Sequence, residues 1–327
     1  MLQDFCVFVN QFEHGIEMNE IENQRAYAAA AIQQRGGWLA KELATLKRQP
    51  VEDSIHDTRV QSRRMRAALE SFQDLFPSQL WQDLYDSIRH ITRTLGETRE
   101  TEVMLGLLEQ LTSPGDAGEN LCREFLDLKL EKKLKKLKRK LDDRLREIDV
   151  RVLRSRIRHL LAHSSSAATQ AGEAVPPPVL TDNLDRVRAT LSVLVQPILG
   201  FRNQSFPRAS DRRLHKLRIA TKKLRYAMEI FDVLWPGGLK RQIAPARALQ
   251  DAAGAHQDWA VLKLFLQKEI RRLTKGNKPY LASQTEQLLA RAEEKKAEVR
   301  ATILPALTEL QQSLQPVVEA KLGRGGR

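Results

Sequence analysis

The sequence has little cysteine, few aromatic residues and no long hydrophobic run. Cys6 and Cys122 are its only cysteines and stand far apart, which argues against a disulfide framework or a zinc ribbon and favours a reducing compartment. No stretch approaches the roughly 18 apolar residues of a membrane helix. The apolar opening, residues 1–9, is short, contains Asp4 and lacks a basic n-region, so we predict no signal peptide. We expect a cytoplasmic protein.

Motifs of the common catalytic classes are also missing. There is no P-loop, no H-E-x-x-H and no G-x-S-x-G in the chain. The His-Asp pair at 56–57 has His-Lys as its later counterpart at 215–216, which a metal-dependent phosphohydrolase would not tolerate. His159 and His163 have metal-ligand spacing but no acidic or cysteine companion. We therefore expect neither an enzyme nor a bound metal or cofactor.

Charge of one sign predominates in the chain. Its 54 Lys and Arg outnumber 41 Asp and Glu, giving a formal net charge of +13. A balance this basic predicts attraction to polyanions and says nothing by itself about the fold. With 327 residues, of which 42% are hydrophobic, the chain can bury a sizeable core.

A basic segment occurs twice. Residues 55–66, IHDTRVQSRRMR, return as residues 214–225, LHKLRIATKKLR. The similarity continues as far as Pro77 and Pro236 at one offset of about 159 residues, and a fixed internal offset indicates a duplicated unit. The two copies predict two equivalent surfaces.

Each copy has the spacing of an amphipathic helix. Met65, Leu69 and Phe72 fall on one face of the first copy, which we expect to enter the core. The opposite faces carry cations at steps of three and four residues: His56, Arg59, Arg63 and Arg66, then His215, Arg218, Lys222 and Arg225. A solvated face usually mixes signs because like charges at i,i+4 repel, yet residues 208–225 hold eight Lys or Arg and one acid. Binding of an anion explains this pattern better.

Helical spacing extends over nearly the whole chain, without an alternating strand pattern, and predicts an all-α fold. Helices are expected over 21–35 and 39–48 with an interruption at 36–37, over 80–95 and 103–111 with Gly96 as a kink or join, as one or two helices over 120–159, and over 180–199. The low-complexity stretch 164–178 predicts a linker. The resulting organisation is a divergent segment over 1–20, a first half over 21–162, a linker over 163–179 and a second half over 180–322.

A second pair of segments strengthens the duplication. Residues 95–103, LGETRETEV, correspond to residues 253–261, AGAHQDWAV, at nearly the same offset. Both keep a glycine and, four positions later, a carboxylate, Glu100 or Asp258. We expect these carboxylates to form ion pairs, and a catalytic role is the less favoured alternative.

The doubled histidine-arginine segment, followed each time by the glycine-carboxylate segment, resembles the CHAD family, the conserved histidine α-helical domain, over roughly residues 21–322. This resemblance implies two four-helix up-and-down bundles related by pseudo-twofold duplication, with a basic central groove or pore that binds inorganic polyphosphate. The implied ligand-binding residues are His56, Arg59, Arg63, Arg64, Arg66, His215, Arg218, Lys222, Lys223 and Arg225. The chain departs from the family pattern with Glu100 in place of Asp and with lysines in place of an arginine pair at 222–223.

The chemistry of polyphosphate fits these residues. Its repeating negative charge requires many convergent donors, with Arg forking onto phosphate oxygens and Lys acting as a point charge. A third basic track lies at 129–140, where Lys132, Lys136 and Arg139 project opposite a stripe of leucines. For this track a merely solvated face is an equal alternative. We therefore predict non-catalytic polyphosphate binding.

Nucleic acid is the main competing partner, because any basic track attracts a phosphate backbone. Aromatic residues make up only 6% of the chain, and those near the stripes face the expected core, with Tyr226 as the exception. Stacking platforms for bases are thus scarce, and we expect weak nucleic-acid binding only. A membrane-surface role ranks last, and a phosphohydrolase is also disfavoured. We expect a cytoplasmic protein that can associate with polyphosphate granules, with its oligomeric state left open.

Overall fold

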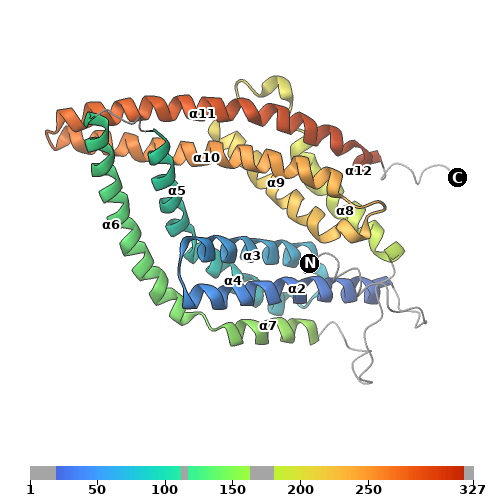
Figure 1. Cartoon of the computed structure of the whole chain (residues 1–327). Coiled ribbons are helices and arrows are strands. Elements are labelled where there is room, and N and C mark those ends of the chain that lie inside the picture. Colours follow the sequence, from blue (N-terminus) through green and yellow to red (C-terminus); the bar gives the residue numbers. More distant parts are fainter. Residues whose placement is uncertain (1–19, 112–116, 163–179, 320–327) are drawn as a thin grey trace.

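The computed structural model describes residues 20–111, 117–162 and 180–319, and every regular element within these ranges is a helix (Figure 1). This confirms the all-α prediction. The linker predicted over 163–179 and nearly all of the segment predicted over 1–20 lie outside the described residues. The division into two halves, each a four-helix bundle, stays a prediction.

The first part of the chain contains six α-helices and one 3₁₀ turn among its described residues. They are α2 (Glu20–Arg48), α3 (Glu52–Ser71), η1 (Gln73–Leu75), α4 (Ser78–Thr94), α5 (Gly96–Leu111), α6 (Ala117–Glu147) and α7 (Val150–Ala162). At Gly96 a new helix begins, because the preceding helix ends before Leu95. The segment 120–159 forms two helices, α6 and α7, instead of one. No described helix is long and apolar enough to cross a membrane.

The later part of the chain contains five α-helices and two 3₁₀ turns among its described residues. Its elements are α8 (Leu180–Leu199), η2 (Asn203–Ser205), α9 (Asp211–Phe231), η3 (Asp232–Leu234), α10 (Lys240–Lys275), α11 (Pro279–Ser313) and α12 (Gln315–Glu319). Both α3 and α9 carry the histidine-arginine segment, and each is followed by a 3₁₀ turn. α9 begins at a serine cap, because the Ser210 hydroxyl accepts a hydrogen bond from the Arg213 backbone N–H at 3.3 Å.

The predicted interruption at residues 36–37 is wrong, because α2 runs through both glycines without a break. Gly36 is instead the place where α7 approaches the backbone of α2. A Cβ atom added to Gly36 would lie 2.6 Å from Cδ1 of Ile157, so a larger residue would force the Ile157 side chain to move. The glycine that weakens the helix in isolation thus permits close packing in the folded protein.

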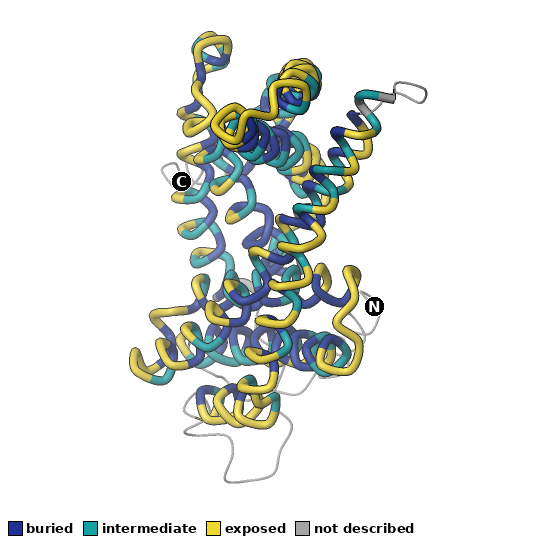
Figure 2. Tube along the Cα trace, turned by 90° about the vertical axis from the view of Figure 1, so that its left-hand side faces the viewer, coloured by how far each residue is buried: buried dark blue, intermediate teal, exposed yellow. Residues whose placement is uncertain are grey.

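The hydrophobic core forms two clusters, and neither is confined to one half of the chain. The larger cluster joins α2, α3, α4 and α7 to α8, α9 and parts of α10 and α11. The smaller one joins α5 and α6 to α10 and α11. Phe72 and its repeat counterpart Phe231 are fully buried in the larger cluster, with ring centroids 5.7 Å apart in an edge-to-face contact. Figure 2 shows the buried sides of the helices turned inward.

Four helices that carry the two repeated motifs meet pairwise. α3 packs against α9 and α5, and α10 packs against the same two helices. In Figure 1, α10 and α11 run along the top, α2, α3, α4 and α7 lie below, and α5 and α6 connect these two levels. The sequence thus places both histidine-arginine segments and both glycine-carboxylate segments in one ring of helix contacts.

Candidate functional site: a cationic cluster between α3 and α9

The cationic stripes of α3 and α9 face each other. Arg59 and Arg63 on α3 lie close enough to Arg218 on α9 for their charges to act on one another, and Lys222 on α9 experiences all three. We call Arg59, Arg63, Arg218 and Lys222 the central cationic cluster. Among the described residues, no carboxylate lies within the 4.0 Å ion-pair distance of these four side chains. The fold therefore gathers like charges from both repeats without a carboxylate at ion-pair distance.

Two of these arginines lie beside the two repeated glycines. A Cβ atom added to Gly96 would lie 3.1 Å from Nη1 of Arg59, and one added to Gly254 would lie 3.7 Å from Nε of Arg218. Each guanidinium therefore lies over the backbone of the helix that carries the glycine, α5 or α10. The sequence showed both glycines at equivalent positions, but their purpose required knowing which arginine faces them.

The cluster is costly to keep charged in the absence of a ligand. Burial and the neighbouring arginines lower the pKa of Arg59, and burial lowers that of Arg63. The pKa of Lys222 falls from its ordinary value of 10.5 to about 8 because burial removes its hydration and because four arginines surround it. These four are Arg63, Arg218, Arg66 and Arg59. The Nε atoms of Arg63 and Arg218 are buried and have no hydrogen-bond partner.

The two motif histidines lie beside the cluster and near the second motif. On α9, Nδ1 of His215 donates a hydrogen bond to Oε1 of Gln257 at 3.0 Å. In the first repeat, Arg99 stands where Gln257 stands in the second. The pKa of His56 is lowered, first by partial burial and then by the positive charge of Arg99. Each histidine thus lies near the residue three positions after the repeated glycine, a relation that local spacing in the sequence does not reveal.

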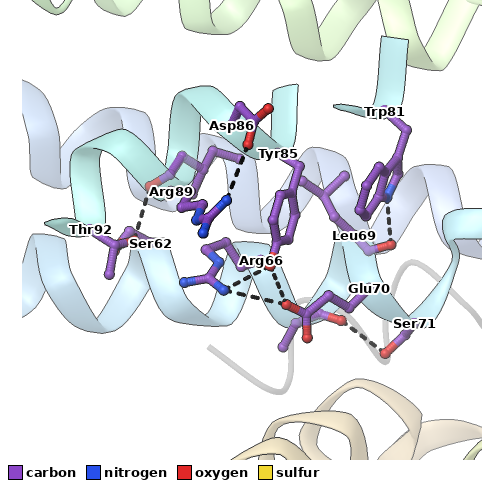
Figure 3. A network of polar contacts seen from close by, with 12 residues as sticks. Ser62, Arg66, Leu69, Glu70, Ser71, Trp81, Tyr85, Asp86, Arg89 and Thr92 are labelled. Atoms are coloured by element: carbon purple, nitrogen blue, oxygen red, sulfur yellow. Dashed lines mark hydrogen bonds and ion pairs between the residues drawn. The ribbon is translucent and has the colours of Figure 1, made fainter. Parts of the chain in front are cut away.

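Arg66 belongs to a neutralised network on the outer side of the stripe (Figure 3). Its Nη2 donates to the Tyr85 hydroxyl at 2.7 Å and lies 3.5 Å from Oε1 of Glu70. The Tyr85 hydroxyl in turn donates to the same Glu70 oxygen at 2.6 Å. Arg66 adds charge to the cluster from this anchored position, but it is not a free ligand group.

Arg225 and Arg64 share one carboxylate. The Arg225 guanidinium forms an ion pair with Glu229 and donates from Nε to Oε1 of Gln250 at 3.0 Å. Nε of Arg64, on the other repeat, lies 3.3 Å from Oε2 of Glu229. Arg225 was predicted on the polar face, yet it is only 6% exposed, because Glu229 and Gln250 satisfy its charge inside the protein.

The remaining predicted residues lie outside the cluster. Lys223 is exposed and is not among the residues whose charge shifts the pKa of Lys222. Lys132, Lys136 and Arg139 are exposed on α6. Tyr226, the one candidate stacking residue, is 3% exposed and lies beneath the Arg225 guanidinium, 4.5 Å from its ring centroid.

Glu100 and Asp258 form no ion pair within 4.0 Å among the described residues. They act at longer range, since Glu100 attracts Arg59 and Asp258 attracts Arg218. Burial raises the pKa of Asp258. Among the described residues, no group of three or more His, Cys, Asp or Glu side chains is arranged to hold a metal ion. Guanidinium and ammonium groups such as those of the cluster can bind anions.

Comparison with known proteins identifies the fold. The family profile of the CHAD domain matches residues 29–267. The structure is similar to the crystal structure of the CHAD domain from the plant Ricinus communis, with a TM-score of 0.61 and 20% identity over 87% of this chain and 91% of that one. A second similar structure, PptA from Streptomyces chartreusis, has a TM-score of 0.47 and 17% identity over 89% and 99% of the two chains. No curated protein matches the sequence. The chain belongs to the CHAD domain family.

Proposed function

We propose that this protein binds inorganic polyphosphate at the central cationic cluster without breaking it down. The observation that carries the proposal is the position of Lys222, half-buried among four arginines with no carboxylate at ion-pair distance in the described structure. A lysine with a purely structural role would be exposed to solvent or paired with a carboxylate. A ligand with closely spaced negative charges would provide the missing neutralisation.

Polyphosphate suits the cluster better than nucleic acid does. A guanidinium can fork onto two phosphate oxygens, and the Nε atoms of Arg63 and Arg218 have no hydrogen-bond partner within the protein. Single-stranded nucleic acids depend on aromatic stacking, whereas Phe72, Phe231 and Tyr226 are buried. The proposal includes binding without hydrolysis. Hydrolysis would require an activated water or nucleophile, whereas the cluster consists of guanidinium and ammonium groups that bind phosphate oxygens.

We further propose one joint site rather than two. The pKa of Lys222 on α9 responds to Arg59 and Arg63 on α3, so the charges of both repeats act in one place. A phosphate group near Lys222 would therefore contact residues of both stripes.

As part of the same proposal, the protein is cytoplasmic and associates with polyphosphate granules.

The test is a titration of the protein with long-chain polyphosphate at about 0.15 M salt, where screening suppresses loose charge pairing. Single-stranded DNA, duplex DNA and ATP serve as competitors. We expect polyphosphate to bind tightly and to resist displacement by DNA. The variants R63Q and R218Q should each remove most of the affinity, because both arginines serve one site. Equal or tighter binding of DNA would refute the proposal, and a small additive loss from each variant would refute the joint site.

A further inference from the structure

Lys222 is half-buried without a carboxylate partner. Two other half-buried lysines of the described chain are paired: Nζ of Lys129 forms an ion pair with Glu269, and Nζ of Lys296 lies 2.5 Å from Oδ2 of Asp211. Lys222 instead has arginines around it and no carboxylate within 4.0 Å among the described residues. Its charge therefore has neither full hydration nor a counter-ion in the unliganded protein.

This environment favours the neutral amine of Lys222. Burial removes water from the ammonium group, and Arg63, Arg218, Arg66 and Arg59 repel its charge, which together lower the pKa of Lys222 from 10.5 to about 8. At pH 7.5 about a quarter of the Lys222 side chains are then neutral, against about 0.1% for a lysine with the ordinary pKa. A neutral amine has a free electron pair, so Lys222 is a nucleophile near neutral pH.

The same cluster binds the leaving group that such a nucleophile needs. Arg59, Arg63 and Arg218 are phosphate-binding groups beside the amine, and the Nε atoms of Arg63 and Arg218 have no hydrogen-bond partner within the protein. An acyl phosphate joins a carbonyl carbon, which an amine attacks, to a phosphate, which guanidinium groups bind. It carries about two negative charges, fewer than the positive charges of the central cationic cluster. Lys222 therefore stays in a positive environment when an acyl phosphate binds.

We infer that Lys222 is a site of acylation by small acyl phosphates such as acetyl phosphate, and that the acyl group blocks binding of polyphosphate at the central cationic cluster. The second part rests on the proposed function. In the reaction the Lys222 nitrogen attacks the carbonyl carbon, an N–C bond forms, and the bond from that carbon to the bridging oxygen breaks. Inorganic phosphate leaves with the bonding electron pair and takes up the proton lost by the nitrogen. The arginines stabilise the negative charge that develops on the leaving phosphate.

Acylation and polyphosphate binding oppose each other at this site. The product of acylation is an amide, which has no charge and occupies space among the arginines. Polyphosphate then loses a charged contact at Lys222 and meets a partly filled site. In the other direction, an anion bound beside Lys222 favours its ammonium form, which is not a nucleophile. Bound polyphosphate therefore protects the residue from acylation.

The test treats the full chain with acetyl phosphate at pH 7.5 and follows individual lysines by peptide mass spectrometry. Lys216 and Lys223 are exposed on the same helix and serve as internal references. A pKa of about 8 makes the neutral fraction of Lys222 about 200-fold larger than that of an ordinary lysine. An amine of lower pKa is also a weaker nucleophile, so we expect Lys222 to react at least about tenfold faster than either reference. Long-chain polyphosphate added beforehand should slow the reaction at Lys222.

A pair of variants tests whether the arginines direct the reaction. R63Q/R218Q should lower the rate at Lys222 at least about tenfold, because the amine regains its proton and the phosphate loses two binding groups. R241Q/R247Q makes the same charge change at exposed residues of α10 and should leave the rate at Lys222 nearly unchanged. Circular dichroism melts verify that both variants fold.

The outcomes distinguish this inference from the proposed function. A rate at Lys222 no higher than at Lys223, or a rate in R63Q/R218Q equal to that of the wild type, would overturn the inference even if polyphosphate binds. Selective acetylation of a protein that binds no polyphosphate would support the acylation site and refute the proposed function. Where both occur, acetylated protein should bind polyphosphate at least about tenfold more weakly, and an unchanged affinity would overturn the blocking effect.

Discussion

Replacing Lys222 by methionine (K222M) should stabilise the unliganded protein. Methionine keeps the length and apolar contacts of the side chain but removes a charge that burial and four arginines oppose. The difference between a pKa of 10.5 in the unfolded chain and about 8 in the folded protein corresponds to about 3 kcal/mol at pH values below 8. Partial exposure of the side chain reduces this gain, so we expect about 2 to 3 kcal/mol at pH 7.

The pH dependence gives this prediction its sign. The folded-state pKa of Lys222 is depressed, so below pH 8 the folded protein holds a proton at a free-energy cost. Between pH 8 and 10.5 the folded state releases that proton before the unfolded state does, and the wild type gains stability as pH rises. K222M has no such group, so its advantage should shrink towards zero over this interval.

Urea unfolding of both proteins at several pH values between 7 and 10.5 measures the effect. The control is K216M, at an exposed lysine of the same helix, which should change stability by no more than about 0.5 kcal/mol. Polyphosphate should bind K222M at least about tenfold more weakly, as expected for loss of a charged contact to phosphate. A K222M protein less stable than the wild type at pH 7, or a stability gap that does not vary with pH, would refute the reasoning.

Three further predictions follow from the site. Polyphosphate affinity should fall as pH rises above about 8, because free Lys222 then loses the proton that the bound anion retains; titrations at pH 7 and pH 9 check this, and equal affinities contradict it. G96A should weaken polyphosphate binding several-fold by displacing Arg59, whereas G106A, with nothing within 4 Å of the new Cβ, should leave binding unchanged. Calorimetric titration compares the two affinities. Both substitutions should raise helix stability. E229Q should cost about 2 to 3 kcal/mol in thermal unfolding because Arg225 loses a buried partner, whereas E70Q, at a more exposed pair, should cost under about 1 kcal/mol; similar losses would contradict this.

Much of the fold follows from the period of the apolar residues. Met65, Leu69 and Phe72 recur at helical spacing, and all three are buried, because only one face of α3 can reach the core. The helix interruption predicted at Gly36 is an exception. Its low helix propensity predicts a break in an isolated chain, but the packing of Ile157 against it outweighs that local preference.

The site was predictable only as far as local spacing reaches. The i,i+4 pairs Arg66–Glu70 and Arg225–Glu229 were visible in the sequence and could have marked those arginines as neutralised. The approach of Arg64 to Glu229 was not visible, because it joins residues far apart in the chain. The division of the cationic stripe into paired and unpaired members depends on such tertiary contacts.

The contacts of Glu229 have a consequence for the proposed binding of polyphosphate. It forms ion pairs with Arg64 of α3 and Arg225 of α9, and its backbone carbonyl accepts a bond from Arg35 of α2 at 3.4 Å. A carboxylate fixed inside the protein competes with any dissolved phosphate at very high effective concentration. Ligand binding should therefore leave these three contacts in place. The protein would then bind without rearranging the contacts that join α2, α3 and α9 at Glu229, so no ordering entropy is lost there when the chain binds.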